Sequence, residues 1–377
     1  MSKKIEEVYD EVVDFENLYK SYKKALKGKN RYTAEAIEFQ QDETYNLYKL
    51  QDSLMDHSYT FDKYTKFTIY EPKERVIHAP SFKDKMVQLA LNNILKTYYN
   101  KTFITDSYGS IDNKGTHRCV DKIQHNLRKA KWEYGDTAYI VKFDIKKFFY
   151  SIDRDILKDI YKKKIKDKDV LILLFKIIDS AEQIDEKGLP LGNTISQLSA
   201  NVYLNELDQY AKRQLRIKYY VRYMDDVIAV VENKEKANEV KHKLVNFVKE
   251  NLNIEANLNK TQIFPINQGV NSVGFKIYTT HRLLRDDCKR KIKRKIKAMP
   301  NMVNNKNITT YKCEELLNSW KAHADNGNNY NFKQKLFKKH NYIYEGEKKK
   351  IRLRINYKVD RFKKQIKEGV WKGMHIY

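Results

Sequence analysis

The sequence predicts an α+β fold in which helices cover one face of an antiparallel sheet. From residue 138 onward, the hydrophobic pattern gives elements in the order β-α-α-β-β-α-β, and an order of this kind builds an antiparallel layer fold. The 377 residues include only 12 glycines and 5 prolines, below the usual levels of about 7% and 5%, which favours long helices. Neither an internal repeat nor a Gly/Ser/Pro-rich linker divides the sequence.

The N-terminal region is expected to form helices and one hairpin. Apolar residues recur at helical spacing through residues 15–57. Two short apolar runs around a proline turn predict a hairpin over residues 66–79. Ser81 is placed to cap the helix that follows, and a further helix is expected over residues 120–127.

The central region supplies the strands of the predicted sheet. Its first strand ends at Asp144, and two later strands enclose a tight Met224-Asp225 turn. In chain order we predict a strand over 138–143, helices near 154–164 and 170–178, a loop at 188–192, a helix over 194–215, strands over 219–223 and 227–231, a helix capped by Asn233, and short strands near 254, near 263 and over 273–278. From Lys289 the chain turns basic and helical, with Ile292 and Ile296 on the inner face.

Charge and hydropathy limit the kinds of partner that this chain is expected to bind. Lys and Arg number 74 against 49 Asp and Glu, a net charge of +25, which favours a polyanion such as nucleic acid. A mean hydropathy of −0.76 and the lack of an apolar run near 18 residues argue against a membrane. The 28 tyrosines suit stacking on bases, although codon bias explains them equally well. Three widely spaced cysteines and no secretory signal predict a cytoplasmic protein.

Acidic residues stand at two strand ends. Asp144 follows one predicted strand, and Asp225 and Asp226 occupy the tip of a hairpin. Taken alone, the first is explained as a helix cap and the second as ordinary turn chemistry. Taken together, like charges on adjacent strands repel unless a cation lies between them. Two Mg²⁺ ions held by carboxylates clamp the attacking and leaving oxygens in phosphoryl transfer, which is the reaction class these residues favour.

Four sequence blocks occur in the order and spacing of reverse transcriptase motifs. They are Val141-Lys-Phe-Asp-Ile-Lys-Lys-Phe-Phe149, Gly188-Leu-Pro-Leu-Gly-Asn-Thr-Ile-Ser-Gln197, Tyr223-Met-Asp-Asp226 and Val273-Gly-Phe275. The chain therefore resembles the bacterial, group II intron-like reverse transcriptases. The resemblance implies a right-hand polymerase with N-terminal helices and fingers over 1–135, a palm over 136–280 with a fingers insertion at about 165–195, a helical thumb over 281–345, and a basic tail over 346–377.

The resemblance implies roles for the acidic residues and their neighbours. Asp144 and Asp225 would bind two Mg²⁺ ions, with Mn²⁺ as the alternative. Ile145 is a further metal-ligand candidate, and Asp226 would support the pair. Phe149 matches the aromatic gate that excludes a ribose 2′-hydroxyl, and its ordinary alternative is a core phenylalanine.

Further roles concern the nucleotide and the nucleic acid. Arg75 matches the position that grips the incoming triphosphate, with Lys73 as the nearby alternative. Lys260 falls where the family has a lysine thought to protonate the leaving pyrophosphate, although an exposed structural lysine explains it too. The other implied contacts are Leu191, Gly192 and Gln197 with the substrate, Val273, Gly274 and Phe275 with the primer end, and Lys289, Arg290, Lys293, Arg294 and Lys297 with the duplex backbone.

The loop at 188–197 suggests a subgroup. Most reverse transcriptases carry Gln where this chain has Leu191, and Pro where it has Gln197. Both changes resemble the error-prone enzymes of diversity-generating retroelements, which miscopy template adenines. One alternative is an antiphage defence enzyme that copies a dedicated non-coding RNA. A second, of another class, is an RNA-binding, maturase-like protein without catalysis.

The same resemblance implies the partners. They are an RNA template, a DNA or RNA primer and dNTPs. A small basic accessory protein and a structured non-coding RNA are the further partners that it leaves open.

Overall fold

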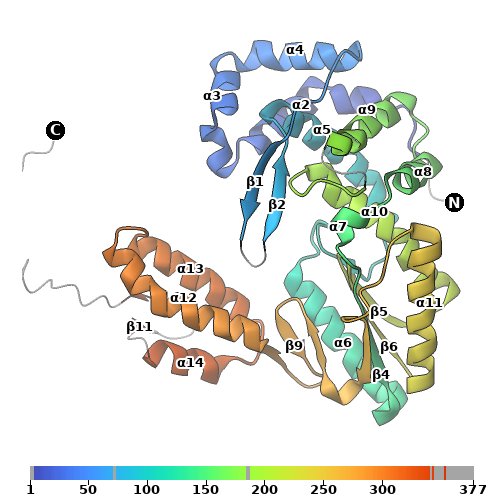
Figure 1. Cartoon of the computed structure of the whole chain (residues 1–377), viewed down its shortest axis with the longest axis vertical. Helices are drawn as coiled ribbons and strands as arrows, with labels where there is room; N and C mark the ends of the chain where they lie inside the picture. Colours follow the sequence, from blue (N-terminus) through green and yellow to red (C-terminus); the bar gives the residue numbers. More distant parts are fainter. Residues whose placement is uncertain (1–3, 71–73, 184–186, 340–341, 344–351, 354–377) are drawn as a thin grey trace, which may run out of the picture. The chain divides into compact units, whose positions relative to one another are not determined.

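The computed structural model describes residues 4–70, 74–183, 187–339, 342–343 and 352–353 (Figure 1). The chain divides into two compact units, Met1–Val270 and Asn271–Tyr377. Lys73 and all of the basic tail except residues 352–353 lie outside the described residues. We describe each unit by itself.

The N-terminal part of the first unit is helical, as predicted. The side chain of Ser81 accepts a hydrogen bond from the Asp84 amide at 3.2 Å, which confirms the predicted cap. Buried Leu18, Leu47 and Met86 belong to one continuous core beneath these helices. The elements are α1 (Tyr9–Val13), α2 (Phe15–Ala25), a 3₁₀ turn (Gly28–Tyr32), α3 (Ala34–Gln41), α4 (Glu43–Met55) and α5 (Phe82–Tyr99).

A two-stranded hairpin lies between α4 and α5. Strands β1 (Thr65–Ile69) and β2 (Arg75–Ala79) pair antiparallel, with Ile69 opposite Arg75 and Thr65 opposite Ala79. The pairing confirms the predicted hairpin. Every residue of β1 is exposed, while His78 of β2 is buried.

A five-stranded sheet forms the lower part of the first unit in Figure 1. Its order is β3-β5-β6-β4-β7, and the four longer strands pair antiparallel, which confirms the α+β class. The two-residue β3 joins β5 in parallel and was not predicted. The bounds are β3 (Ser107–Tyr108), β4 (Tyr139–Phe143), β5 (Tyr219–Tyr223), β6 (Asp226–Val231) and β7 (Gln262–Pro265).

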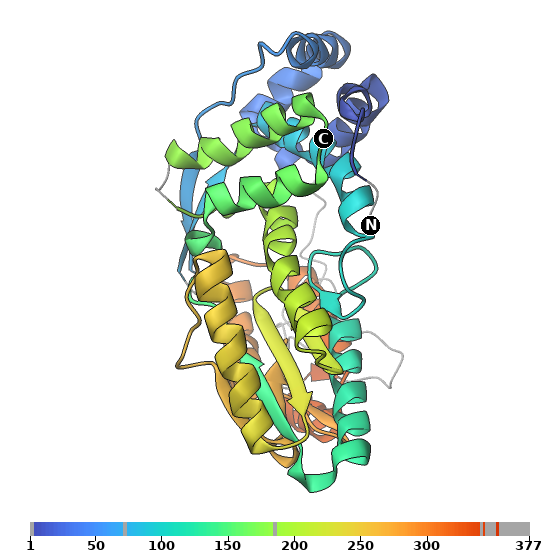
Figure 2. The ribbon, with the colours of Figure 1, turned by 90° about the vertical axis from the view of Figure 1, so that its right-hand side faces the viewer.

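Helices cover both faces of this sheet (Figure 2). Tyr219 points to α6 (Thr116–Tyr134), where its hydroxyl bonds Glu133 and its ring meets Tyr134. The next residue, Tyr220, points the other way and donates to Asp208 of α10 (Thr194–Gln209) at 2.8 Å. Successive strand side chains alternate between faces, so α6 and α10 lie on opposite sides. The prediction that helices cover one face of the sheet is therefore wrong. It was based on the elements from residue 138 onward, and α6 comes before them in the chain.

The remaining helices of the first unit include α8 (Arg154–Lys164) and α11 (Lys234–Leu252), which pack against α10. Asn233 caps α11 as predicted, since its side chain accepts from the Lys236 amide at 2.8 Å. The predicted long helix over 194–215 is also present, with a π-helical turn (Tyr210–Gln214) as its last part. Ile254 lies outside any strand, unlike the prediction. The other elements are a 3₁₀ turn (Gly135–Thr137), α7 (Phe148–Ser151), α9 (Lys168–Asp179), a 3₁₀ turn (Ser180–Gln183) and a 3₁₀ turn (Ile266–Gln268).

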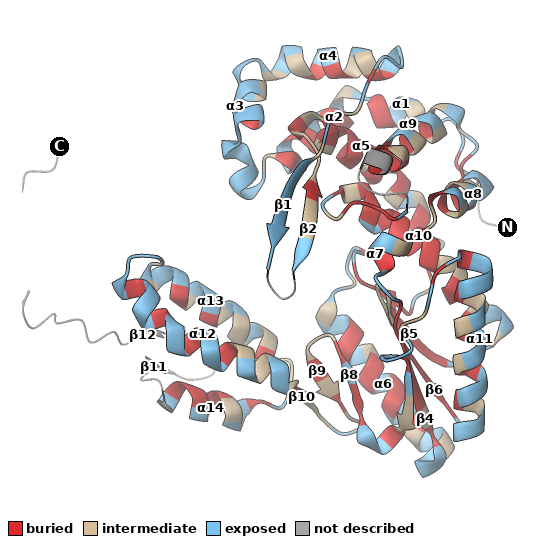
Figure 3. Ribbon diagram, in the orientation of Figure 1, coloured by how far each residue is buried: buried red, intermediate tan, exposed pale blue. Residues whose placement is uncertain are grey.

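The second unit combines a small sheet with a helical bundle. Buried Ile292 and Ile296 face the bundle core, as predicted, and the outer faces are exposed (Figure 3). The predicted strand over 273–278 is shorter, because Val273 and Gly274 form a turn. The elements are β8 (Val270–Ser272), β9 (Phe275–Ile277), β10 (Arg282–Leu284), α12 (Asp286–Asn304), α13 (Thr310–Ala324), α14 (Tyr330–Lys339), β11 (Tyr342–Ile343) and β12 (Arg352–Leu353).

Among the described residues, no helix combines the length and the apolar character that crossing a membrane requires.

Candidate active site

A cavity of about 1150 Å³ opens in the first unit between the sheet, the hairpin and the loop before α10. It is lined by most of the residues predicted to act on the nucleotide. These are Arg75, Ile145, Phe149, Leu191, Gly192, Gln197, Asp225, Asp226 and Lys260. Residues 273–275 and α12 belong to the second unit.

Asp144 directly follows β4 and is joined to the cavity wall by a lysine. The residue is buried, with its side chain 12% exposed, and the Lys260 ammonium lies 3.0 Å from one carboxylate oxygen and 3.1 Å from the other. The backbone carbonyl of Asp144 accepts from the Asn257 amide at 2.8 Å, which holds the strand end against the segment that carries Lys260. The lysine predicted to protonate the leaving pyrophosphate is thus bound to the predicted metal-binding carboxylate, 116 residues away in sequence.

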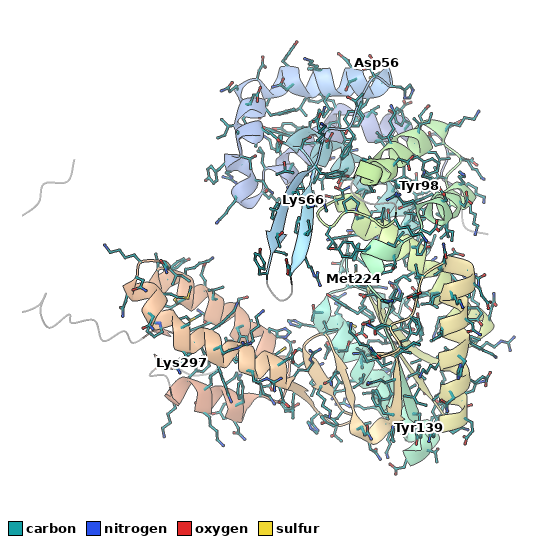
Figure 4. All side chains as sticks on the ribbon, in the orientation of Figure 1. Asp56, Lys66, Tyr98, Tyr139, Met224 and Lys297 are labelled. Carbon is teal, nitrogen blue, oxygen red and sulfur yellow. The ribbon has the colours of Figure 1, made fainter. Side chains whose placement is uncertain are left out.

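Asp225 and Asp226 lie at the β5–β6 hairpin, whose turn residue Met224 is labelled in Figure 4. Burial and the neighbouring charge of Asp144 raise the pKa of Asp225, and Lys260 and Arg222 partly oppose this. Asp226 lies 3.5 Å from the Lys142 ammonium. Two carboxylates that repel each other at the end of a sheet provide a place where a cation is favoured.

The raised pKa of Asp225 predicts a stability effect. An acid whose folded pKa lies above its ordinary value destabilises the fold once it ionises, so the penalty is absent below pH 3.8 and complete above the folded pKa. We expect Asp225→Asn to raise the urea midpoint at pH 7 in EDTA, and this gain to shrink as the pH falls towards 3.8. The matched control, Asp226→Asn, breaks the contact with Lys142 and should give no gain. A lower midpoint for Asp225→Asn would contradict the prediction.

The carboxylates of Asp144 and Asp225 have the chemistry of anionic donors to a hard divalent cation. Within the described residues, no group of three or more His, Cys, Asp or Glu side chains is gathered for a metal ion, so the donor set needs other oxygens. The Ile145 carbonyl is one such oxygen. In the antiparallel bridge between Ile145 and Ala256, the Asn257 amide donates to the Asp144 carbonyl at 2.8 Å and the Lys146 amide donates to the Glu255 carbonyl at 2.9 Å. The Ile145 carbonyl takes part in neither of these hydrogen bonds. Oxygen-only donor sets select Mg²⁺ or Mn²⁺ over softer metals.

Basic side chains line the wall of the cavity. Arg75, at the start of β2, is exposed and lines the cavity, as the resemblance requires. Lys146 and Lys147 also line it and are exposed. Sequence reasoning assigned them no role, although both stand inside the motif that begins at Val141. With Lys260, four basic side chains line the cavity beside Asp225 and Asp226, an arrangement that suits a polyphosphate chelated to a metal ion.

Two glycines fix the loop before α10. The Leu191 carbonyl accepts from the His78 amide at 2.9 Å. Gly192 has φ +128°, and a Cβ there would lie 2.6 Å from the His78 carbonyl oxygen. Gly188 has φ +88°, and a Cβ there would lie 2.7 Å from the Cα of Tyr150. Only glycine fits such positions. The close approach of Gly192 to His78 and the hydrogen bond from the His78 amide together fix the Leu191 backbone against β2.

The second unit contains the other predicted contacts. Val273 and Gly274 have φ +46° and +87°, so residues 273–274 form a strained turn. The Phe275 ring lies 4.7 Å from the ring of His323, which places α13 behind this turn. On α12, one exposed stripe carries Arg290, Lys293, Arg294 and Lys297 (the last labelled in Figure 4), while Lys289 pairs with Asp286 at 3.1 Å.

The family model for reverse transcriptase (RNA-dependent DNA polymerase) matches residues 63–277, more than half of the chain. The chain belongs to the reverse transcriptase family. The matched range holds the whole cavity, and the family comprises the enzyme class that the motifs predicted. Membership and the observed sheet also confirm the predicted right-hand polymerase fold class.

Curated relatives include intron-encoded proteins. Group II intron-encoded protein LtrA of Lactococcus lactis subsp. cremoris is 29% identical over 216 residues, 55% of this reverse transcriptase and 34% of LtrA. Protein YkfC of Escherichia coli K12 is 25% identical over 262 residues, 58% of this chain and 66% of YkfC. The match thus spans about a third of LtrA, and it confirms the predicted likeness to group II intron reverse transcriptases.

Among solved structures, a telomerase from Candida albicans in complex with a fragment of telomeric RNA gives a TM-score of 0.46 at 12% identity. The alignment covers 67% of this chain and 55% of that one.

Proposed function

We propose that this reverse transcriptase extends a DNA or RNA primer with dNTPs along an RNA template. The observation that carries the proposal is the cavity, where Asp225 and Asp226 meet basic, aromatic and loop residues from four other parts of the sequence. The reaction joins the primer 3′-oxygen to the α-phosphorus of the dNTP, and the bond to pyrophosphate breaks.

The chain's residues divide this work. Asp144, Asp225 and the Ile145 carbonyl would hold two Mg²⁺ or Mn²⁺ ions. When bound, such ions would favour ionisation of the attacking hydroxyl and offset charge on the phosphates. Arg75 binds the triphosphate, and Phe149 packs against the sugar. Lys260 reaches the leaving pyrophosphate only after its 3.0 Å contact with Asp144 breaks.

DNA synthesis on poly(rA) primed with oligo(dT), in buffer containing Mg²⁺, tests the proposal. We expect dTTP incorporation that requires both the primer and the metal ion. RNA binding without incorporation, in Mg²⁺ and in Mn²⁺, would refute the proposal and favour the RNA-binding, maturase-like alternative.

We further propose that synthesis is error-prone, as in a diversity-generating retroelement. Leu191 lines the cavity with an aliphatic side chain, and its backbone is fixed by His78. An aliphatic group makes no hydrogen bond to the incoming nucleotide, and such bonds are a main source of substrate discrimination.

Leu191→Gln is expected to lower misincorporation opposite template adenine by about 2- to 10-fold, the worth of one hydrogen bond. Sequencing the cDNA made on one RNA template by parent and variant measures the effect. Leu191→Met, which keeps the apolar character, should leave the error spectrum unchanged. The proposal fails if parent and Leu191→Gln give the same spectrum.

The basic stripe on α12 is proposed to bind the backbone of the RNA–DNA duplex. Replacing Lys293 and Lys297 by Gln should weaken hybrid binding and reduce the slope of log Kd against log salt by about 1 per lysine. Lys234 and Lys249, exposed on α11, offer a control variant with the same loss of charge. Titrations of a labelled hybrid at several NaCl concentrations give the slopes. Equal slopes for the two double variants would contradict the assignment.

A further inference from the structure

A fully buried ion pair lies behind the turn that carries Asp225. Arg222 of β5 and Asp208 of α10 are both 0% exposed. Two parallel bonds join them, from Nε to Oδ1 at 2.8 Å and from Nη2 to Oδ2 at 2.7 Å. Burial alone lowers the pKa of Arg222, but Asp208 outweighs it, so the net pKa is raised and the guanidinium keeps its charge.

The other guanidinium donors fix Arg222 to three further groups. Nη1 donates to the Met224 carbonyl at 2.8 Å and to the Asn201 side-chain oxygen at 3.1 Å, and Nη2 donates to Ser107 Oγ at 2.8 Å. An arginine has five N–H groups, and all five are therefore bonded. Only one of these bonds reaches the hairpin turn, and it ends on the residue directly before Asp225.

That turn is strained and closely enclosed. Met224 has φ +54°, a left-handed conformation that is unfavourable for a residue other than glycine. Its amide donates to the Tyr108 carbonyl at 3.1 Å, and a Cβ on Gly109 would lie 2.8 Å from its side chain. The bond from Arg222 to the Met224 carbonyl holds the other side of the same residue. The turn therefore keeps its conformation through contacts from outside the hairpin.

Helix α10 connects this cluster to the nucleotide wall. Its first turn lines the cavity with Thr194, Ser196 and Gln197. Farther along the same helix, Asn201 and Asp208 stand two turns apart and both bond Arg222. A rigid helix thus joins the wall that faces the nucleotide to the guanidinium that holds the turn.

We infer that Arg222 is a positioning residue, held by Asp208, that sets the place of Asp225 relative to the nucleotide wall. The inference rests on the proposed function. Stability alone is a poor reason for the pair, because well-packed apolar residues in place of a buried ion pair are often equally stable or more so. What apolar residues cannot replace is the bond to the Met224 carbonyl.

The test removes the charges but keeps the packing. In the triple variant Arg222→Met, Asp208→Leu, Tyr220→Phe, the Tyr220 hydroxyl that bonds Asp208 is removed as well, so it does not stay buried without a partner. We expect a lower Tm, because the Met224 carbonyl and the buried oxygens of Asn201 and Ser107 lose their donor, and an unchanged KM for dTTP. We expect kcat on poly(rA)/oligo(dT) to fall about 10- to 100-fold, because misplaced reacting groups cost rate rather than binding. A folded triple variant with parental kcat would overturn the inference.

Tyr161→Phe is the matched control. The Tyr161 hydroxyl pairs with Ser199 of α10 at 2.9 Å, and this pair is buried like the ion pair but makes no hydrogen bond to the turn. We expect a lower Tm with parental kcat. An equal loss of kcat in this control would mean that any loosening of the core slows synthesis, which also overturns the inference.

Two further measurements cover the remaining outcomes. If the triple variant fails to fold, Arg222→Lys decides, because one ammonium cannot reach Asp208 and the Met224 carbonyl as the guanidinium does. Reduced kcat supports the inference, and parental kcat overturns it.

If the parent makes no DNA, the proposed function fails, and hydrogen exchange at the Met224 and Asp225 amides still tests the positioning. Exchange about 10-fold faster in the variant supports it, and unchanged exchange overturns it.

Discussion

Asp225→Ala is expected to abolish DNA synthesis, with a loss of more than about 10³-fold. A metal ion held by a carboxylate supplies several kcal/mol of charge stabilisation in the transition state, and each 1.36 kcal/mol is tenfold in rate. Asp225 lines the cavity and carries a pKa raised by burial and by Asp144, so a bound cation would favour its ionised carboxylate. Primer extension on poly(rA)/oligo(dT), followed over hours, measures the loss.

The same variant should bind an RNA–DNA hybrid almost as the parent does. Affinity for nucleic acid comes mainly from cations that neutralise phosphates, and Asp225 contributes none. A filter-binding titration at fixed salt compares the two proteins. Asp52→Ala is the control, an acidic residue on α4 that does not line the cavity. If Asp225→Ala retained synthesis within tenfold of the parent, Asp225 would not be a metal ligand and the proposed mechanism would fail.

The strand ends that place Asp144 and Asp225 could be predicted from the sequence because their signals are local. An alternating apolar strand stops at Asp144, and two apolar strands leave only Met224 and Asp225 between them. Pairing of Phe143 with Val227 then brings both strand ends together. The period of a strand and the length of a turn therefore go far towards assembling the acidic centre.

Other features depend on contacts that no local pattern contains. The sequence shows that Lys260 and Arg222 are basic, but not that Lys260 bonds Asp144 or that Arg222 pairs with Asp208. Arg222 is the one charged residue in the otherwise aromatic and apolar strand β5. A single charge in a strand of this kind is the signal that could have marked Arg222 as a buried, paired residue. The helices on the second face of the sheet were not predicted, because their position also depends on contacts between distant parts of the sequence. Tyr219 faces α6 and Tyr220 faces α10, and alternation alone does not say which helix covers which face.

Phe149→Ala is expected to admit ribonucleotides, raising kcat/KM for rUTP relative to dTTP by about 10- to 100-fold. Forcing an extra group into a closed site costs roughly 1–3 kcal/mol, and the 2′-hydroxyl would be that group. The Phe149 backbone is fixed, because its carbonyl accepts from the Leu189 amide at 2.7 Å and Gly188 packs against it. The ring lies 5.6 Å from that of Phe148, which limits its retreat. A fixed backbone and a supported ring are what a steric gate needs.

Tyr150→Phe is the matched control for this gate. Tyr150 also lines the cavity and is 41% exposed, so the change alters the neighbouring residue while keeping an aromatic ring in place. Its discrimination between rUTP and dTTP should equal that of the parent. Single-nucleotide extension with each substrate gives the two kcat/KM values. Parental exclusion of rUTP by Phe149→Ala would make Phe149 a core residue, and sugar selection would then have to come from another part of the cavity wall.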